Sequence, residues 1–239
     1  MKSIGLLGGM SWESSLEYYR IINQQVRDRL GVLHSAKIVM VSVEFAEIEK
    51  LQHQDRWQEA GDILVEAARG IERGGADFLL ICTNTMHKLA DQVQSGIGIP
   101  ILHIADATAE KIVASGLKRV GLLATRFTME ENFYKGRLTD HYGLDVLIPG
   151  EDDRETVHRV IYDELCTGQI LPRSRHSYIE ICNQLISRGA EAIILGCTEI
   201  GLLVKAADLD VPVFDTTRIH CTAAVDKALS GVGWVSTGS

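Results

Sequence analysis

Residues 75–84, GADFLLICTN, return 114 positions later as residues 189–198, GAEAIILGCT. Each copy is typical of a buried strand that runs into a short polar cluster, because Gly precedes the apolar run and Thr follows it. The register places Thr83 opposite Cys197. A chain with two similar halves usually places its chemistry where they meet. The repeat therefore predicts a cleft with one reactive side chain on each wall, and the two walls differ.

The segments around each copy repeat one order of elements. An apolar strand over residues 3–7 precedes a helix over 12–30, and residues 119–125 resemble that opening strand. Strands and helices alternate through both halves. This alternation predicts an α/β fold of two pseudo-symmetric lobes, each a mostly parallel sheet flanked by helices, with an interlobe active-site cleft.

The expected boundaries follow from apolar periodicity and from Gly and Pro positions. Strands are expected over residues 37–43, 77–82, 99–104, 144–148, 192–196 and 211–214, and helices over 57–73, 84–96, 105–116, 156–165, 178–188 and 216–229. Residues 1–104 plus 216–239 are expected to form the first lobe and residues 105–215 the second. The Gly- and Ser-rich end, residues 230–239, is expected to be frayed.

Composition excludes several classes of partner. The 239 residues carry a formal net charge of -8 and no basic run, which argues against nucleic acid and anionic membranes as partners. No apolar run approaches the length of a membrane span. The five cysteines match no disulfide framework or zinc ligand set, and the eight histidines show no metal-binding spacing. A reduced, cytoplasmic compartment without a bound metal is the expectation.

The polar cluster after each strand has two interpretations. Thr83, Asn84 and Thr85 can donate hydrogen bonds to a carboxylate, helped by the positive end of the following helix. Alternatively, Thr83 or Asn84 simply caps that helix. The recurrence of the cluster at Cys197-Thr198 favours a functional role, because two caps need not recur in register.

The cysteines are expected to differ in exposure. Cys197 follows a Gly at a strand end, where a thiol can be partly exposed and its pKa lowered by backbone N–H groups. Cys166, Cys182 and Cys221 are expected to be inert and buried. Strand side chains alternate faces, so Cys82 faces the core if Thr83 faces the cleft.

Other polar residues are weaker candidates. The Gly-rich residues 5–11 match no nucleotide-binding motif, and close backbone approach to a small ligand fits them better. Arg126 either clamps a carboxylate or is a surface residue. For Gln52, His53 and Arg56, a solvated surface is favoured. His87, expected on the first turn of its helix, can polarise a neighbouring thiol or hydroxyl.

Three segments together resemble the aspartate/glutamate racemase superfamily: GLLGGMS at 5–11, TNTMH at 83–87 and LGCTEI at 195–200. The resemblance runs over essentially the whole chain and is greatest to bacterial PLP-independent amino-acid racemases. It implies a homodimer and a reaction without a cofactor. In that reaction one cysteine thiolate removes the α-proton of an amino acid, and a thiol on the opposite face returns one.

The resemblance also implies a set of site residues. The α-carboxylate donors would be Asn84, Thr85, Thr125, Thr128 and Thr198. Met10, Gln52, Arg126 and Glu199 complete the expected substrate-binding set. The expected catalytic residues are Cys197 and Thr83, with Cys82 and His87 as possible auxiliaries.

This chain departs from the family pattern in its first motif, which is usually Cys-Asn-Thr. Here Thr83 precedes Asn84, and a Thr hydroxyl is too weak an acid to serve as a routine base. We hypothesise that Cys197 deprotonates an L-amino acid and that Thr83, on the opposite face, donates or relays a proton. The α-proton is then expected to exchange with solvent faster than the L-amino acid is inverted.

An acidic substrate, L-Asp or L-Glu, is expected from the resemblance. Its distal carboxylate needs a ligand, and the candidates are Arg126, Arg56, Gln52 and His53. Some relatives bind the distal group with a Lys that is missing from residues 164–168 here, which leaves glutamate or a broader neutral range open. Two rival functions are an amino-acid sensor without turnover and a single-cysteine decarboxylase of the same superfamily.

Overall fold

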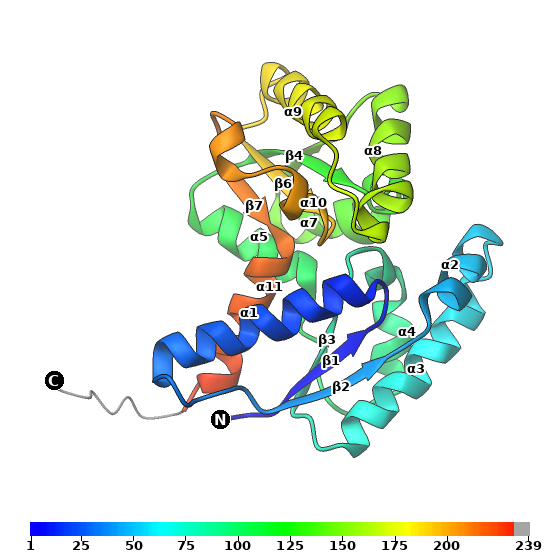
Figure 1. The fold of residues 1–239 in the computed structure, drawn as a ribbon, viewed down its shortest axis with the longest axis vertical. Helices are drawn as coiled ribbons and strands as arrows, with labels where there is room; N and C mark the ends of the chain where they lie inside the picture. The colour runs from blue at the N-terminus through cyan, green and yellow to red at the C-terminus, as the bar shows by residue number, and fades with distance from the viewer. Residues whose placement is uncertain (232–239) are drawn as a thin grey trace, which may run out of the picture.

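A computed structural model of the chain describes residues 1–231 and contains two α/β lobes (Figure 1). The blue-to-cyan first lobe holds one parallel sheet, and the green-to-orange second lobe holds another, each covered by helices. The predicted architecture is therefore confirmed. Residues 232–239, most of the end expected to be frayed, lie outside the described residues.

The first lobe is built on a sheet in the order β2-β1-β3, with all neighbours parallel. Ile4 of the central strand is in register with Ile38 and with Phe78. Its elements are β1 (Ile4–Gly8), α1 (Trp12–Leu30), β2 (Ile38–Ser42), α2 (Phe45–His53), α3 (Trp57–Arg73), β3 (Phe78–Ile81), the 3₁₀ helix η1 (Thr85–Leu89) and α4 (Ala90–Ser95).

The two faces of this sheet bury alternate residues against different helices, as the period of two in a strand requires. Ile4, Leu6 and Leu80 pack with Tyr18 and Val26 of α1. On the other face, Leu7, Leu79 and Ile81 pack with side chains of α3 and α4, among them Leu64, Ile71 and Val93. Both faces are apolar, which explains the unbroken hydrophobic runs in β1 and β3.

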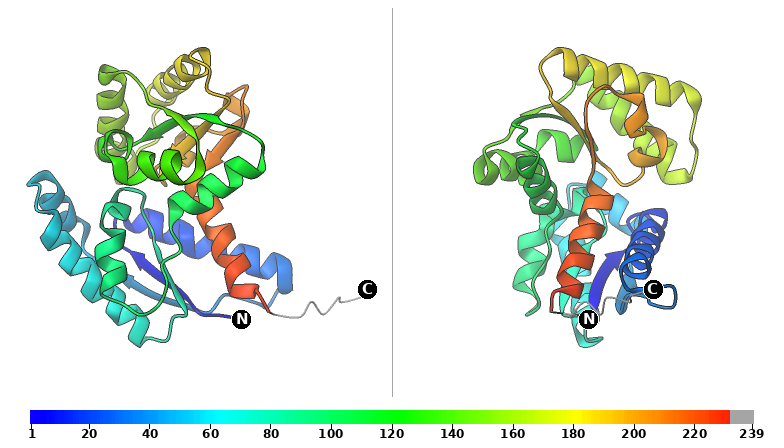
Figure 2. Two further views of the ribbon diagram at one scale, coloured as in Figure 1. Left: turned by 180° about the vertical axis from the view of Figure 1, so that it is seen from behind. Right: turned by 90° about the vertical axis from the view of Figure 1, so that its left-hand side faces the viewer.

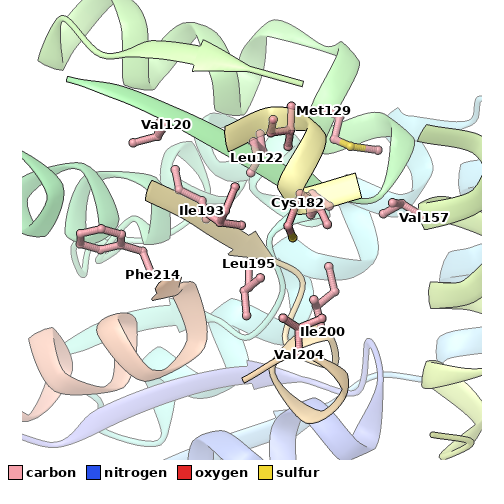
Figure 3. Close-up of a cluster of buried hydrophobic side chains, with 14 of the residues drawn as sticks. Val120, Leu122, Met129, Val157, Cys182, Ile193, Leu195, Ile200, Val204 and Phe214 are labelled. Atoms are coloured by element: carbon pink, nitrogen blue, oxygen red, sulfur yellow. The ribbon is translucent and has the colours of Figure 1, made fainter. Parts of the chain in front are cut away.

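The second lobe has a sheet in the order β5-β4-β6-β7, also parallel throughout. Its elements are α5 (Ile104–Ala114), β4 (Arg119–Ala124), α6 (Arg126–Glu130), α7 (Asn132–Tyr142), β5 (Asp145–Leu147), α8 (Glu151–Asp163), η2 (Leu165–Thr167), α9 (Pro172–Ser187), β6 (Ala192–Gly196), α10 (Ile200–Leu203), η3 (Ala206–Asp208) and β7 (Val213–Asp215). Figure 3 shows part of its core, where Ile193 and Leu195 of β6 lie among Leu122, Cys182 and Phe214.

The final helix, α11 (Thr216–Leu229), leaves the second sheet and runs down into the first lobe (Figures 1 and 2). Its Cys221, Ala224 and Val225 share a core with Ile4 and Tyr18 of that lobe. This packing supports our proposal that residues 216 onward belong with residues 1–104, and residues 105–215 with the second lobe.

Several expected elements differ from those observed, among them the helix expected over 178–188, which begins at Pro172. The strand over 99–104 is reduced to an isolated bridge between Ile101 and Leu79, because His103 already caps α5 by accepting from the N–H of Ala105. The helix expected over 84–96 is divided into η1 and α4. The helix expected over 156–165 begins earlier, at Glu151 after Gly150.

Candidate active site

The repeated segments meet in one cavity between the lobes. The strands β3 and β6 end at Ile81 and Gly196, and the turns that follow them carry Thr83 and Cys197 into this cavity. Its lining comes from both lobes: Met10, Phe45, Gln52, Thr83, Asn84, Thr85, Met86, Thr125, Ile161, Tyr162, Cys166, Gly196, Cys197, Thr198 and Glu199. The cavity volume is about 30 Å³, which holds two or three water molecules at roughly 10–15 Å³ each. An amino acid is larger, so side chains or lobes must move to admit one.

The loop after β1 forms a third part of the wall. Gly9 adopts φ +93°, and a Cβ there would lie 2.1 Å from the carbonyl oxygen of Val43. Only Gly fits this close approach of two backbones, and it brings Met10 and Ser11 to the cavity side of α1. Ser11 then caps α1 by accepting from the N–H of Ser14.

The Cys197 thiol is hydrogen-bonded to the carboxylate of Glu199. Its Sγ donates to Glu199 Oε2 at 3.0 Å. The same carboxylate accepts from Ser11 Oγ at 2.7 Å and from Thr198 Oγ1 at 2.5 Å, and Ser14 is bonded to Thr198. Three side chains from two distant parts of the chain thus donate to Glu199, and Ser14 holds one of them, Thr198.

This arrangement raises the pKa of the Cys197 thiol well above its usual value. Burial is the largest cause, and the neighbouring Glu199 carboxylate adds to it because two negative charges repel. The expectation of a lowered pKa from backbone N–H groups is therefore wrong for Cys197. Backbone donation contributes in the lowering direction, but burial and the carboxylate outweigh it.

Thr83 is half-buried at the opposite wall, and His87 holds its backbone. His87 Nδ1 lies 2.7 Å from the Thr83 carbonyl oxygen, which can only accept, so Nδ1 carries the proton. Nε2 accepts from the N–H of Ile104. Burial lowers the pKa of His87 well below its usual value, and the ring is neutral. Both ring nitrogens are occupied by backbone, so His87 positions Thr83 and does not polarise a group in the cavity.

Cys82 faces away from the cavity. Its side chain is 1% exposed, within the core that contains Tyr18 and Cys221, and burial raises the pKa of its thiol. Strand alternation predicts this opposition between Cys82 and Thr83. By contrast, Cys166 was expected to be inert in the core but lines the cavity and is half-buried. Burial also raises the pKa of its thiol.

Three threonine hydroxyls form a cluster across the two lobes. Thr85 Oγ1 lies 2.8 Å from Thr125 Oγ1 and 3.4 Å from Thr128 Oγ1, and the last two are 3.2 Å apart. Thr125 also caps α6 by accepting from the N–H of Thr128. Thr85 and Thr125 line the cavity, and Thr128 lies behind them. Hydroxyls that now bond one another can turn their protons toward a carboxylate.

Asn84 presents an unpaired oxygen. Its Nδ2 donates to Thr216 Oγ1 at 3.1 Å, and Thr216 donates onward to the carbonyl oxygen of Leu195. Because the Thr216 proton is used there, Thr216 must accept from Asn84, which fixes the orientation of the amide. Asn84 Oδ1 is buried without a hydrogen-bond partner in the structure. Such an oxygen is an acceptor for an ammonium group.

The remaining wall carries no cation among its described residues. Gln52 is buried there, accepts from Tyr162 OH at 3.2 Å and lies against Met86. The solvated-surface expectation is wrong for Gln52, because α2 turns it inward. It is right for His53 and Arg56, which are exposed and paired with Glu49 and Glu59.

Arg126 does not line the cavity. It is the first residue of α6, and its exposed guanidinium lies 3.6 Å from Glu155 of α8. Its expected clamp on a substrate carboxylate is therefore not formed. Sequence reasoning missed six lining residues, of which only Met86 and Gly196 lie within a recognisable motif: Phe45, Met86, Ile161, Tyr162, Cys166 and Gly196.

Comparison with known proteins settles the family. The model of the Asp/Glu/hydantoin racemase family matches residues 7–224, which include every expected site residue. The chain belongs to this family. It is 54% identical to a Yersinia pestis protein assigned to the Asp/Glu racemases, whose structure superposes with a TM-score of 0.90 over 96% of this chain and 100% of that one.

The chain is also similar to two other proteins of the racemase family. An aspartate racemase homologue from Pyrococcus horikoshii is 34% identical, with a TM-score of 0.83 over 95% of this chain and 99% of that one. The broad specificity amino-acid racemase RacX of Bacillus subtilis is 21% identical over 70% of this chain and 71% of its own length.

Two searches of the described residues were negative. Within residues 1–231, no helix is long and apolar enough to cross a membrane. In the same range, no group of three His, Cys, Asp or Glu residues is placed to hold a metal ion.

Proposed function

We propose that this racemase-family protein is a cofactor-independent amino-acid racemase that takes the α-proton of an L-amino acid with Cys197. The observation that carries the proposal is the placement of Cys197 and Thr83 on the two lobes' strand-end turns, lining one small cavity. That pair gives one face of the cavity a thiol and the other only a hydroxyl. Proton transfer is therefore expected to be fast on the Cys197 face of the substrate and slow on the Thr83 face.

The substrate's charged groups find partners in the cavity. The Thr85, Thr125 and Thr128 hydroxyls supply donors for the α-carboxylate, where negative charge builds up once the α-proton leaves. Asn84 Oδ1, which lacks a partner in the structure, supplies an acceptor for the α-ammonium. These two sites hold the α-carboxylate and the α-ammonium, which all amino acids share. The substrate side chain then lies against the part of the cavity lined by Gln52.

Glu199 prepares the thiol. A protonated Cys197 cannot remove a proton, and Glu199 Oε2, 3.0 Å from Sγ, is placed to receive the thiol proton. Once the carboxyl is protonated it no longer opposes the thiolate. The thiolate then takes the α-proton: the S–H bond forms, the C–H bond breaks, and the electron pair spreads into the carboxylate.

Inversion needs a proton from the opposite face. Thr83 passes its hydroxyl proton to the α-carbon while a water molecule replaces it, which leaves hydroxide. The proton held by Glu199 returns to solvent and neutralises that hydroxide, so the cycle closes with Cys197 as a thiol. If the Cys197 thiol instead exchanges its proton with solvent and returns the new one to the α-carbon, the L-enantiomer re-forms with solvent hydrogen.

The side-chain wall favours uncharged substrates. An acidic substrate, which the sequence resemblance implied, needs a cation or several donors for its distal carboxylate. The described lining offers the Gln52 amide and the Tyr162 hydroxyl, with Phe45, Met86 and Ile161 beside them. We propose that neutral amino acids are turned over at least as well as L-Asp and L-Glu.

Polarimetric racemisation of a panel of L-amino acids tests this proposal. Cys197→Ala is expected to abolish inversion, and Cys82→Ala, which removes a core thiol of the same kind, is expected to preserve it in the folded protein. Inversion that survives Cys197→Ala would overturn the assignment. Glutamate and aspartate favoured far above glutamine and methionine would overturn only the substrate range.

One observation favours a second candidate, a protein that binds amino acids without turning them over. The raised pKa of Cys197 and the hydroxyl of Thr83 leave the resting cavity without a ready base. Tight binding of an amino acid, with no α-proton exchange on long incubation in deuterated water, would select this alternative.

We also propose a cytoplasmic, homodimeric protein. All five cysteines are free in the structure, which fits a reducing compartment. The sequence resemblance implies the dimer.

A further inference from the structure

Thr198 and Glu199 form a wall between the cavity and a groove on the outer surface. Both residues line the cavity, and both also line this groove, which has a volume of about 150 Å³. The start of α1 contributes Glu13 and Ser14 to the same groove, and Ser14 is 1% exposed. The two hollows are therefore separated by the polar side chains that follow Cys197.

A chain of hydrogen bonds crosses this wall. Cys197 Sγ donates to Glu199 Oε2 at 3.0 Å, and Thr198 Oγ1 donates to the same oxygen at 2.5 Å. Ser14 Oγ in turn donates to Thr198 Oγ1. The chain thus runs without a gap from the thiol in the cavity to a hydroxyl in the outer groove. Because a hydroxyl both donates and accepts and its proton can rotate, such a chain can pass protons in either direction.

Glu13 lies beside the outer end of this chain. It lines the same groove as Ser14, and its Oε2 is buried without a hydrogen-bond partner among residues 1–231. Burial is the main reason why the pKa of the Cys166 thiol is raised, and the Glu199 and Glu13 carboxylates both add to it, so the charge of Glu13 acts on the cavity side of the groove. A carboxylate oxygen without a donor is an acceptor for a proton.

A bound amino acid blocks direct proton exchange between Cys197 and solvent. The cavity volume of about 30 Å³ holds only a few water molecules, and a substrate that enters displaces water from the Cys197 side. The hydrogen that Cys197 takes from the α-carbon then has no water beside it. If this hydrogen is to exchange with solvent before it is returned, it needs a route through the cavity wall.

We propose that Glu199, Thr198 and Ser14 relay protons between the cavity and the outer groove. Cys197 is the inner end of this relay, and the Glu13 carboxylate is the outer end. The inference rests on the proposed function, because it begins with the proton that Cys197 gives to Glu199. It adds the route by which that proton leaves and a solvent proton enters while the substrate stays bound.

Each step of the relay breaks one O–H bond and forms another. Protonated Glu199 gives its proton to the Thr198 oxygen, and Thr198 passes its own proton to Ser14. Ser14 then passes its own proton to the Glu13 carboxylate, which releases it to water in the groove. Both hydroxyls end with one proton each, and Glu199 is again a carboxylate. The reverse sequence brings a solvent proton to the Cys197 thiolate.

Proton NMR in deuterated water tests the relay, with L-Gln, L-Met, L-Glu or L-Asp as substrate, whichever the wild-type protein turns over fastest. Ser14→Ala removes the outer hydroxyl and keeps the N–H that caps α1. Cys197 is then expected to return the same hydrogen, so α-proton exchange should slow about 100-fold, the low end of what a positioned proton-transfer group contributes. KM should not change, because Ser14 does not line the cavity. Inversion should fall less than exchange, because Thr83 limits it.

Imidazole distinguishes a relay from a structural role of Ser14. Thr198 and Glu199 line the groove themselves, so imidazole there can exchange protons with them once the Ser14 hydroxyl is gone. Exchange by Ser14→Ala is expected to speed up with imidazole concentration, and exchange by the wild type is not. Ser15→Ala is the matched control, because the equally buried Ser15 hydroxyl of the same turn bonds to backbone groups outside the relay. It is expected to preserve exchange, and circular dichroism shows whether each variant is folded.

A second pair of variants tests the outer end. Glu13→Gln keeps the side-chain shape but removes the acceptor, so it is expected to slow exchange. Glu17→Gln is expected not to, because Glu17 lines the same groove but is paired with Arg20. Equal effects of the two substitutions would remove Glu13 from the relay.

The possible failures of the relay and of the proposed function are distinct. Exchange as fast in Ser14→Ala as in the wild type, or slow exchange that imidazole does not restore, would overturn the relay and leave Cys197 as the base. Exchange that persists in Cys197→Ala, or that is absent from the wild type, would overturn the proposed function and the relay with it.

Discussion

Replacing Thr85 by Val removes one hydroxyl from the threonine cluster and keeps the side-chain shape. Thr85 Oγ1 lies 2.8 Å from Thr125 Oγ1, and Thr125 retains Thr128 at 3.2 Å when Thr85 is changed, so no hydroxyl is left buried alone. We therefore expect a stability loss of about 1 kcal/mol, the net value of one neutral hydrogen bond.

The effect on catalysis is expected to be larger than the effect on stability. In the proposed complex the Thr85 hydroxyl donates to a carboxylate, and a hydrogen bond to a charged group contributes about 1.5–3 kcal/mol. At about 1.36 kcal/mol per factor of ten, kcat/KM for an L-amino acid should fall about 10- to 150-fold. Polarimetric initial rates measure kcat/KM, and urea unfolding measures stability.

Thr108→Val is the matched control for this substitution. Thr108 is also fully buried, and its hydroxyl donates to the carbonyl oxygen of Ile104 within α5, outside the cavity. It is expected to cost similar stability and to leave kcat/KM unchanged. If Thr85→Val and Thr108→Val alter kcat/KM equally, the threonine cluster does not bind the carboxylate.

Three further predictions follow from other parts of the structure. Thr83→Cys is expected to bring the rate of inversion up toward the rate of α-proton exchange, because it gives the second face a thiol; an unchanged ratio of the two rates would argue against Thr83 facing the α-carbon. Burial lowers the pKa of His103 to about 3 and of His220 to about 4, below the value of about 6.5 in the unfolded chain, so the unfolded state binds more protons below that pH. The free energy of unfolding in urea should thus be constant above pH ~6.5. Below that pH it should fall by about 1.4 kcal/mol per pH unit for each of these two histidines, until the pH reaches their folded-state pKa values. His220→Gln should reduce this slope, whereas His176→Gln, which changes an exposed histidine, should not. Gly9→Ala should destabilise the protein more than Gly75→Ala. Both glycines have a positive φ, but only at Gly9 would the added Cβ lie 2.1 Å from a backbone oxygen, that of Val43. Equal melting temperatures of the two variants would contradict this prediction.

The repeat allowed much of the site to be predicted from sequence. β3 and β6 are the matching strands of two separate sheets, each paired with the opening strand of its own lobe, so the polar turns that follow them place Thr83 and Cys197 at corresponding points of the two lobes. Strand alternation then separates Cys82 from Thr83. These inferences need only local periodicity and the pseudo-symmetry of the two halves.

The residues that sequence reasoning misplaced depend on contacts between distant segments. The pKa of Cys197 is raised with help from Glu199, whose position is fixed by Ser11, 188 residues away along the chain. Gln52 and Tyr162 meet across the lobes from helices that carry no motif. His103 belongs to a segment that reads as a strand, but its capping of α5 ends that strand early.

The most direct test of the account is proton NMR of an L-amino acid in deuterated water. With the wild-type protein, the α-proton signal is expected to disappear faster than the D-enantiomer accumulates, because Cys197 removes and returns hydrogen on one face while Thr83 is slow on the other. Cys197→Ser is expected to abolish this exchange. Exchange that persists in Cys197→Ser, or inversion that leaves the α-proton fully retained in both enantiomers, would contradict the account.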